Sequence, residues 1–389
     1  MMFFAKKDKF ETKETEYLER KSEQKEINDP LKIILEFLKE KKFLEQFTDF
    51  NDISKVKWNF GSLGKKMMND LVLSWNNKTA KKMSNIRPVE QITPRIGTEY
   101  LIEIFAEDHL KAPFGFTRVY ETAIEPFDSD KFTFHGQKSK NIVLEYATIP
   151  STSKDMLVSW LEFVTDFFES SGLSSDDTQV EYQRLEDNPD QEHYFFDRFL
   201  IKNIFHFGTE TVATVSNKLD FEFENYDKRF PDDKKQSCFV HDDLRQNDYF
   251  PHVIEISINI ERFILAVLLN NFSQERIRTS LLTKLKLPPS LAPVKCVIFP
   301  LSIVDKRTKI ASDRIYETLK ERFFVSYDEK GTLEKRITKY NELGVPFYIE
   351  TDPDLVDNNL FRLHDNKFKT SSELDIKDIV SYISSKINE

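Results

Sequence analysis

The sequence contains little cysteine and little glycine, and it has no long apolar run. Only two cysteines, Cys238 and Cys296, occur among 389 residues, so cysteine alone can build neither a disulfide framework nor a zinc cluster. Cys296 lies in an apolar stretch, and we expect it to be a core residue. No run approaches the ~18 apolar residues that a membrane-spanning helix needs. With nine glycines in all, the chain shows no glycine loop that would cradle a phosphate.

Positive charges are fewer than negative charges. The chain has 66 Asp and Glu against 56 Lys and Arg, a formal net charge of −10. Proteins that bind nucleic acid draw most of their affinity from Lys and Arg contacts to phosphates, so this balance disfavours a nucleic-acid partner. The amino-terminal segment gains Asp8 and Glu11 early, which is untypical of a signal peptide or an amphipathic transit peptide.

Motifs of common catalytic and metal sites are absent. The seven histidines are scattered without HExxH spacing, and no GxSxG occurs. His241, Asp242 and Asp243 are adjacent but lie in a polar segment, where a solvated surface is expected. Lysines in 65–70 and 78–82 could touch phosphates, although a solvated helix face is favoured. We therefore predict no metal and no cofactor.

The chain nevertheless has enough apolar material for two or three domains, with 39% hydrophobic residues and 35 Phe. Residues 1–30 predict a charged arm. Helical apolar spacing follows over 29–47, with Pro30 suited to the first turn. Two polar segments, 170–193 and 223–237, predict surface insertions.

The last hundred residues alternate between strand and helix patterns. Gly344 suits the end of one of these helices. The alternation predicts a small α/β domain with a mixed, mostly parallel sheet. The expected strands are 295–302, 323–328, 346–352 and 360–365, and the expected helices are 312–323, 332–344 and 372–387.

Five segments resemble glycyl-tRNA synthetases, and they occur in the order found in that family. The resemblance implies an α+β protein with a class II antiparallel catalytic-type domain, followed by an anticodon-binding-type domain. It divides the chain into an arm and helix (1–50), a synthetase-like domain (51–286) and an anticodon-binding-like domain (287–389). The five segments are 57–75, 205–221, 251–272, 287–302 and 328–352.

Segment 251–272, PHVIEISINIERFILAVLLNNF, is similar to motif 3 of this family. The resemblance places Arg262 at the position of an arginine that holds the ATP phosphates, and Ser257 at a substrate-facing serine. Asn259 and Glu261 stand where the family usually has glycines. A carboxylate beside a polyphosphate is repulsive, and added Cβ atoms fill space.

Segment 95–104 is similar to motif 2, and there Leu101 stands where the family has an arginine, while Glu103 is kept. Thr211 stands at the position of a glutamate that holds the substrate amine, and 86–91 is interpreted as a remnant of an Arg-Pro-Glu loop. A leucine cannot stabilise the charge that develops during adenylate formation. These departures predict a pseudoenzyme without catalytic residues.

On that interpretation Glu255, Glu261 and Arg262 are structural relics that pair with one another or with neighbours, against the alternative of a working ATP site. Segments 141–175 and 378–389 resemble the accessory subunit of animal mitochondrial DNA polymerase, which has this synthetase-like architecture. The resemblance implies residence on the matrix side of mitochondria.

Three hypotheses follow. The first is a non-catalytic accessory or scaffold subunit of a mitochondrial assembly: the DNA polymerase, a respiratory-chain complex or the mitochondrial ribosome. The others are a free tRNA- or DNA-binding module and a divergent glycyl-tRNA synthetase. The expected partners are protein subunits, and segment 57–75 is compatible with a homodimer.

Overall fold

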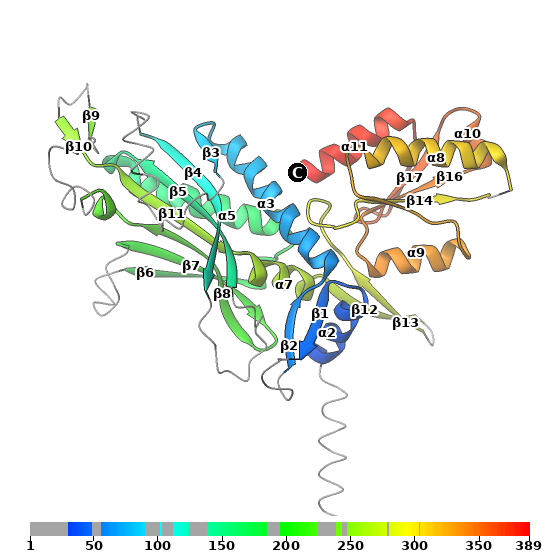
Figure 1. Ribbon diagram of the computed structural model, residues 1–389, viewed down its shortest axis with the longest axis horizontal. Helices are drawn as coiled ribbons and strands as arrows, with labels where there is room; N and C mark the ends of the chain where they lie inside the picture. The colour runs from blue at the N-terminus through cyan, green and yellow to red at the C-terminus, as the bar shows by residue number, and fades with distance from the viewer. Residues whose placement is uncertain are drawn as a thin grey trace, which may run out of the picture. The chain divides into compact units, whose positions relative to one another are not determined.

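A computed structural model describes most of the chain (Figure 1). The described residues are 30–48, 56–89, 102, 112–123, 138–184, 195–224, 239–242, 247–277, 280–302 and 304–389. They divide into two compact units, residues 1–64 and 65–389, and each unit is described by itself.

The first unit contains helix α2 (Pro30–Glu40) and an antiparallel pair of strands, β1 (Leu44–Thr48) and β2 (Val56–Phe60). The predicted helix over 29–47 is therefore too long. Lys42 has a φ of 66°, a backbone conformation that an α-helix cannot contain, and the chain turns there into β1. Close packing requires Gly64, because a Cβ at that position would lie 2.3 Å from the carbonyl oxygen of Phe43.

The second unit begins with a seven-stranded sheet in the order β3-β4-β5-β11-β8-β7-β6. All neighbouring strands are antiparallel except β3 and β4. The sheet confirms the antiparallel domain of the expected α+β fold. Its strands are β3 (Ile86–Pro88), β4 (Phe114–Ala123), β5 (Lys138–Thr148), β6 (Thr178–Arg184), β7 (Asp197–Phe205), β8 (Gly208–Asn217) and β11 (His252–Asn259).

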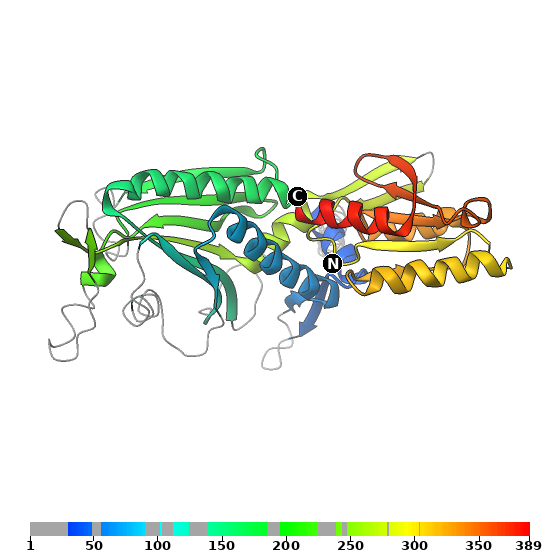
Figure 2. The same cartoon turned by 90° about the horizontal axis from the view of Figure 1, so that it is seen from above.

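Helices α3 (Ser62–Lys82) and α5 (Ser153–Ser170) cover one face of this sheet, and Figure 2 shows α5 running along it. The Trp75 indole of α3 donates to Thr117 Oγ1 of β4 at 3.0 Å. Trp160 of α5 packs edge-on against Tyr146 of β5. Aromatic side chains therefore form the core between helices and sheet, as the phenylalanine content suggested.

Two elements differ from the predicted surface insertions. Part of 170–193 is strand β6, which pairs with β7 along its whole length at the edge of the sheet. Of 223–237, only the first two residues are described, and the Phe223 side chain is fully buried. Polar composition marked β6 as a loop because an edge strand exposes most of its side chains.

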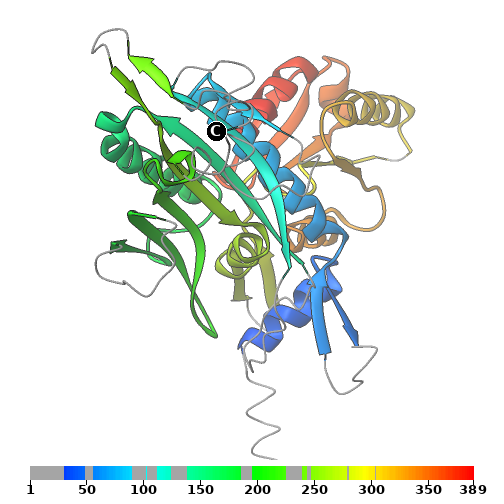
Figure 3. The same ribbon diagram turned by 60° about the vertical axis from the view of Figure 1, so that its left-hand side comes forward.

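One helix and two hairpins also belong to this part of the chain. Helix α7 (Ile260–Asn270) continues directly from the end of β11, as Figure 3 shows. Two hairpins are formed by β9 (Val240–Asp242) with β10 (Asn247–Tyr249), and by β12 (Phe272–Ile277) with β13 (Ser280–Leu285).

The carboxy-terminal domain has a five-stranded sheet in the order β15-β14-β16-β17-β18. Strand β14 is parallel to both neighbours, whereas β17 is antiparallel to both, so the sheet is mixed but not mostly parallel. Sequence reasoning missed β18, whose side chains are mainly polar and exposed. The strands are β14 (Cys296–Pro300), β15 (Val325–Tyr327), β16 (Phe347–Thr351), β17 (Phe361–Asp365) and β18 (Thr370–Leu374).

Helices pack on both faces of the smaller sheet. Ile298 on one face contacts a cluster that includes Ile315 and Ile383, whereas Phe299 on the other contacts Tyr340. Consecutive residues of β14 thus serve opposite layers, which explains why the whole strand is apolar and buried. The helices are α8 (Lys306–Lys320), α9 (Leu333–Glu342), α10 (Pro353–Val356) and α11 (Ile376–Asn388).

Candidate functional site: the polar face of the large sheet

Buried and partly accessible side chains alternate along strand β11. Ile254, Ile256 and Ile258 are fully buried, whereas Glu255 and Ser257 between them are partly accessible. Successive side chains point to opposite faces of a sheet. The apolar set lies on the face that α5 covers, so the polar set lies on the opposite face.

Four charged side chains meet on this polar face. Glu145 of β5 is directly opposite Glu255 of β11. Arg118 of β4 forms an ion pair with Glu145 at 3.1 Å, and Lys218 forms one with Glu255 at 2.5 Å. The two carboxylates therefore each have a cation, and they stand side by side with a cation on each outer side.

The burial of these ion pairs determines the charge state of their members and the cost of removing one of them. Both Arg118 and Glu145 are almost completely buried. Desolvation by itself lowers the pKa of Lys218, but the nearby carboxylates, Glu255 foremost, raise that pKa above its usual value. Lys218 consequently stays charged, and removal of one member of either pair would leave a poorly solvated ion.

The strand ends where Asn259 caps α7. Its side-chain oxygen accepts a hydrogen bond from the Arg262 backbone N–H at 2.9 Å, and its amide donates to Ser139 Oγ at 2.7 Å. Asparagine is a favoured capping residue because it satisfies a free N–H of the first helical turn. The side chain that the resemblance places at a family glycine position thus caps this helix.

The other two charges of this segment lie beside the cap. The Glu261 carboxylate accepts a hydrogen bond from the Lys140 backbone N–H at 3.0 Å, and burial raises its pKa. Arg262 donates from its guanidinium to the carbonyl oxygen of Thr211 at 2.9 Å. Together with Glu255, these residues pair with neighbours and not with one another, whereas their status as relics stays a prediction.

Several predicted positions fall elsewhere. Leu101, Glu103 and Cys238 lie outside the described residues, as does Asp243. Cys296 is a fully buried core residue, as expected, and burial raises the pKa of its thiol. His241 and Asp242 belong to β9, and Ile86–Pro88 form β3 at the edge of the sheet, with 90–91 outside the described part.

The lysines of 78–82 are not a purely solvated helix face. The Lys82 ammonium lies 5.3 Å from the Trp160 ring centroid, and Lys78 lies 5.9 Å from that of Phe167. Burial lowers the pKa of both lysines. These positions indicate cation–π packing against α5.

Sequence reasoning missed Arg118, Glu145 and Lys218. A signal for the first two was present, because each is a single charge inside an apolar strand pattern. Their pairing depends on strand order, which local sequence does not encode. Within the described ranges no group of three or more His, Cys, Asp or Glu residues could hold a metal ion. No helix in those ranges is long and apolar enough to cross a membrane.

An antiparallel sheet with a strand-to-helix segment bearing Arg262, followed by a mixed α/β domain, is a class II synthetase-like architecture. Comparison with known families agrees, because the anticodon binding domain family matches residues 295–386.

Curated relatives extend the likeness beyond that domain. Glycine–tRNA ligase of Clostridium tetani is 27% identical over 280 residues, 71% of this chain and 58% of the relative. The enzyme named glycine–tRNA ligase in Borrelia garinii is 27% identical over 286 residues, 73% of this chain and 63% of the relative. The chain thus spans about three-fifths of the length of these relatives.

This finding corrects the expectation that the chain is not an enzyme. The relatives it resembles along most of its length are named as ligases, which are enzymes. The described residues supply no observation of a lost catalytic group, since Leu101 lies outside them and Arg262 stands at the start of α7.

Proposed function

We propose that this synthetase-like chain serves as an accessory subunit of a larger mitochondrial protein assembly. The DNA polymerase is the partner suggested by the resemblance of 141–175 and 378–389 to its accessory subunit. The observation that supports a protein partner is a group of exposed apolar side chains before and within the first turns of α8: Leu301, Val304 and Ile310.

We call these three residues the docking surface, and two of their apolar side chains are largely exposed to solvent. Val304 is 92% exposed and Ile310 is 68% exposed. Helix α8 buries Thr308, Ser312 and Ile315 against the sheet, so Ile310 lies on the outward side. Burying an exposed aliphatic side chain contributes roughly 1.5–3 kcal/mol, so two such residues can anchor an interface.

The charges beside the surface specify the chemistry of the partner. Lys306 and Lys309 flank Ile310 on α8, and their ammonium groups form no ion pair within the described part of the chain. Exposed apolar side chains beside two lysines suit a protein segment that carries both apolar and acidic side chains. Such a partner also fits a chain whose overall negative charge disfavours nucleic acid.

Gentle affinity purification of the tagged protein from its own cells, followed by native-size analysis and mass spectrometry, tests the proposal. Stoichiometric recovery of mitochondrial DNA polymerase, with the tagged protein in the matrix fraction, would support it. Recovery of respiratory-chain or ribosomal subunits would replace the polymerase as partner. Recovery of the protein alone would contradict an accessory role.

A second candidate function is activation of glycine, favoured by the names of the relatives and by Arg262 at the motif 3 position. It predicts glycine-dependent exchange of pyrophosphate into ATP by the pure protein. It also predicts loss of that exchange in Arg262→Ala but not in Lys154→Gln, an exposed change on α5. Absence of exchange in the unmodified protein would exclude this candidate.

A further inference from the structure

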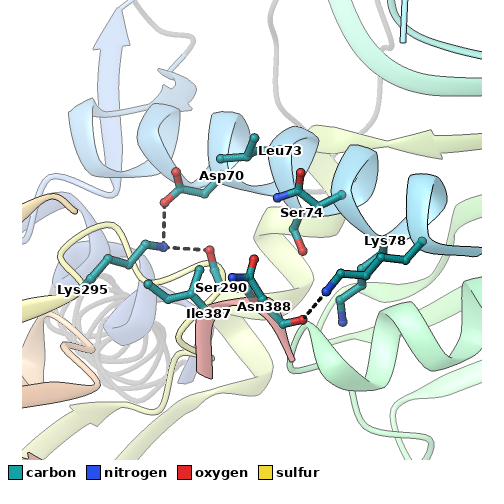
Figure 4. A pocket seen from close by; sticks show the side chains of 10 residues that line it. Asp70, Leu73, Ser74, Lys78, Ser290, Lys295, Ile387 and Asn388 are labelled. Carbon is teal, nitrogen blue, oxygen red and sulfur yellow. Dashed lines mark hydrogen bonds and ion pairs between the residues drawn. The ribbon is translucent and has the colours of Figure 1, made fainter. Parts of the chain in front are cut away.

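Helix α3 contacts the carboxy-terminal part of the chain through a buried ion pair. The Lys295 ammonium lies 2.9 Å from Asp70 Oδ2 and donates to the carbonyl oxygen of Ser290 at 2.7 Å (Figure 4). The Asp70 and Lys295 side chains are 9% and 8% exposed. Lys66, one turn earlier on α3, also pairs with Asp70. This pair therefore ties α3 to the residue that precedes β14.

A second contact lies two turns further along α3. The Lys78 ammonium donates to the main-chain oxygen of Glu389 at 2.7 Å, and that of Lys81 donates to the main-chain oxygen of Asn388 at 3.3 Å. Both oxygens belong to the end of α11. Carbonyl groups at a helix C-terminus lack partners within the helix and carry partial negative charge, so lysines stabilise them.

The surroundings of these lysines contain partners for their ammonium groups. They line a groove of about 410 Å³ whose wall also includes Asp166 and Glu389. Lys78 donates in addition to Ser170 Oγ at the end of α5, at 2.7 Å. Charges of both signs therefore line this groove, and the lysines have partners there within the chain.

Between the two contact points the packing is incomplete. A cavity of about 50 Å³ separates them, lined by Leu73, Ser74, Asn77 and Ile387 among others. The charged contacts therefore lie on either side of a small void between α3 and the carboxy-terminal domain.

On another side the same domain touches the hairpin that leads into it. Gly344, at the end of α9, approaches Leu285 and Leu287 so closely that an added Cβ would lie 2.7 Å from the Leu287 side chain. This contact is apolar and has no charge, so it can persist when the ion pair is broken.

We propose that α3 is an electrostatic latch for the carboxy-terminal domain, with Asp70–Lys295 at one end and Lys78 and Lys81 at the other. When the latch opens, the domain turns about the Gly344–Leu287 contact. Such a device would let a partner or a change in ionic conditions alter the position of the docking surface.

Distance measurement between two spin labels tests the latch in the full chain. The labels replace Val158 on α5 and Lys309 on α8, two exposed residues, in a background with Cys238→Ser; Cys296 is buried and stays unlabelled. The unmodified latch should give one narrow distance distribution. Combining Asp70→Asn with Lys78→Gln and Lys81→Gln should broaden it at least twofold or add a second distance.

Control variants keep the outcome interpretable. Lys154→Gln removes an exposed α5 lysine and should leave the distribution narrow. If Asp70→Asn fails to fold, as circular dichroism would show, Lys78→Gln with Lys81→Gln tests the outer end alone, and 1 M salt should act in the same direction. A distribution that stays narrow in all folded latch variants and in high salt would overturn the proposal.

Discussion

Glu145 and Glu255 stand directly opposite each other on neighbouring strands of the large sheet. Like charges in this position are destabilising unless each is compensated. Here Arg118 compensates the first and Lys218 the second. Each of the two facing carboxylates is therefore compensated by its own cation.

Removing one charge from the buried pair should be strongly destabilising. Glu145→Gln keeps the size of the side chain but leaves Arg118 without that carboxylate in a buried position. We expect a loss of about 3 kcal/mol or more in the free energy of unfolding, measured by urea titration. The matched change Glu121→Gln breaks the exposed pair with Lys140 and should cost about 1 kcal/mol or less. Equal effects of the two changes would contradict this account.

Two glycines with positive φ allow the cost of backbone strain to be measured separately from the cost of a steric contact. Gly344 has a φ of 68° and abuts Leu287, whereas Gly331 has a φ of 87° and no atom within 4 Å of an added Cβ. Gly331→Ala should cost about 1 kcal/mol, from strain alone. We expect Gly344→Ala to lower the midpoint of thermal unfolding further, because Leu287 must also move. Identical midpoints for the two variants would show that Leu287 moves away from the added methyl group at no cost in stability.

The buried Lys295 predicts a pH dependence of stability. Desolvation, only partly offset by Asp70, lowers the pKa of Lys295 from 10.5 to about 8. Between about pH 8 and 10.5 the unfolded chain then binds more protons at this residue than the folded chain, so folding is favoured as pH rises. Relative to Lys295→Met, the native protein should gain stability between pH 7.5 and 9.5 in urea titrations. A difference that stays constant with pH would show that the pKa of Lys295 is not depressed.

The cap that Asn259 forms on α7 predicts a smaller loss of stability than the buried ion pair does. Asn259→Ala removes the acceptor for the Arg262 N–H and should destabilise the chain by about 1 kcal/mol. Asn259→Asp retains the acceptor oxygen but loses the donor to Ser139 and adds charge near Glu261. Asn259→Ser keeps a capping oxygen and should be the mildest of the three in urea unfolding. A loss as large for Asn259→Ser as for Asn259→Ala would show that capping is not the role of this side chain.

Local patterns predicted much of the fold. The alternation in 252–259 and the apolar run after it gave strand and helix correctly, and five regular elements of the last hundred residues fall within a few residues of expectation. Two kinds of error occurred: the bounds of α2 and α8 were misplaced, and two strands were missed where polarity misled. Strand β6 and strand β18 are edge strands with exposed polar side chains, and both were missed.

The candidate site was only partly predictable. Glu255 and Arg262 were found because they interrupt an apolar segment, but their partners Thr211, in β8, and Lys218, directly after β8, are distant in the sequence. Likewise, Asp70 and Lys295 are 225 positions apart, so only the tertiary structure brings them together. The arrangement of strands and helices in the fold determines which charges pair with one another. The spacing of these residues along the chain does not.

The most direct test of the accessory role compares capture of a partner by three forms of the tagged protein. Ile310→Asp places a negative charge in the docking surface, on α8. The control Val158→Asp places the same charge on α5, where the replaced side chain is 49% exposed. The account predicts that the native protein and Val158→Asp recover the same mitochondrial partner in equal amounts, whereas Ile310→Asp loses at least nine-tenths of it. Equal recovery by all three forms, or no partner with the native protein, would contradict the account.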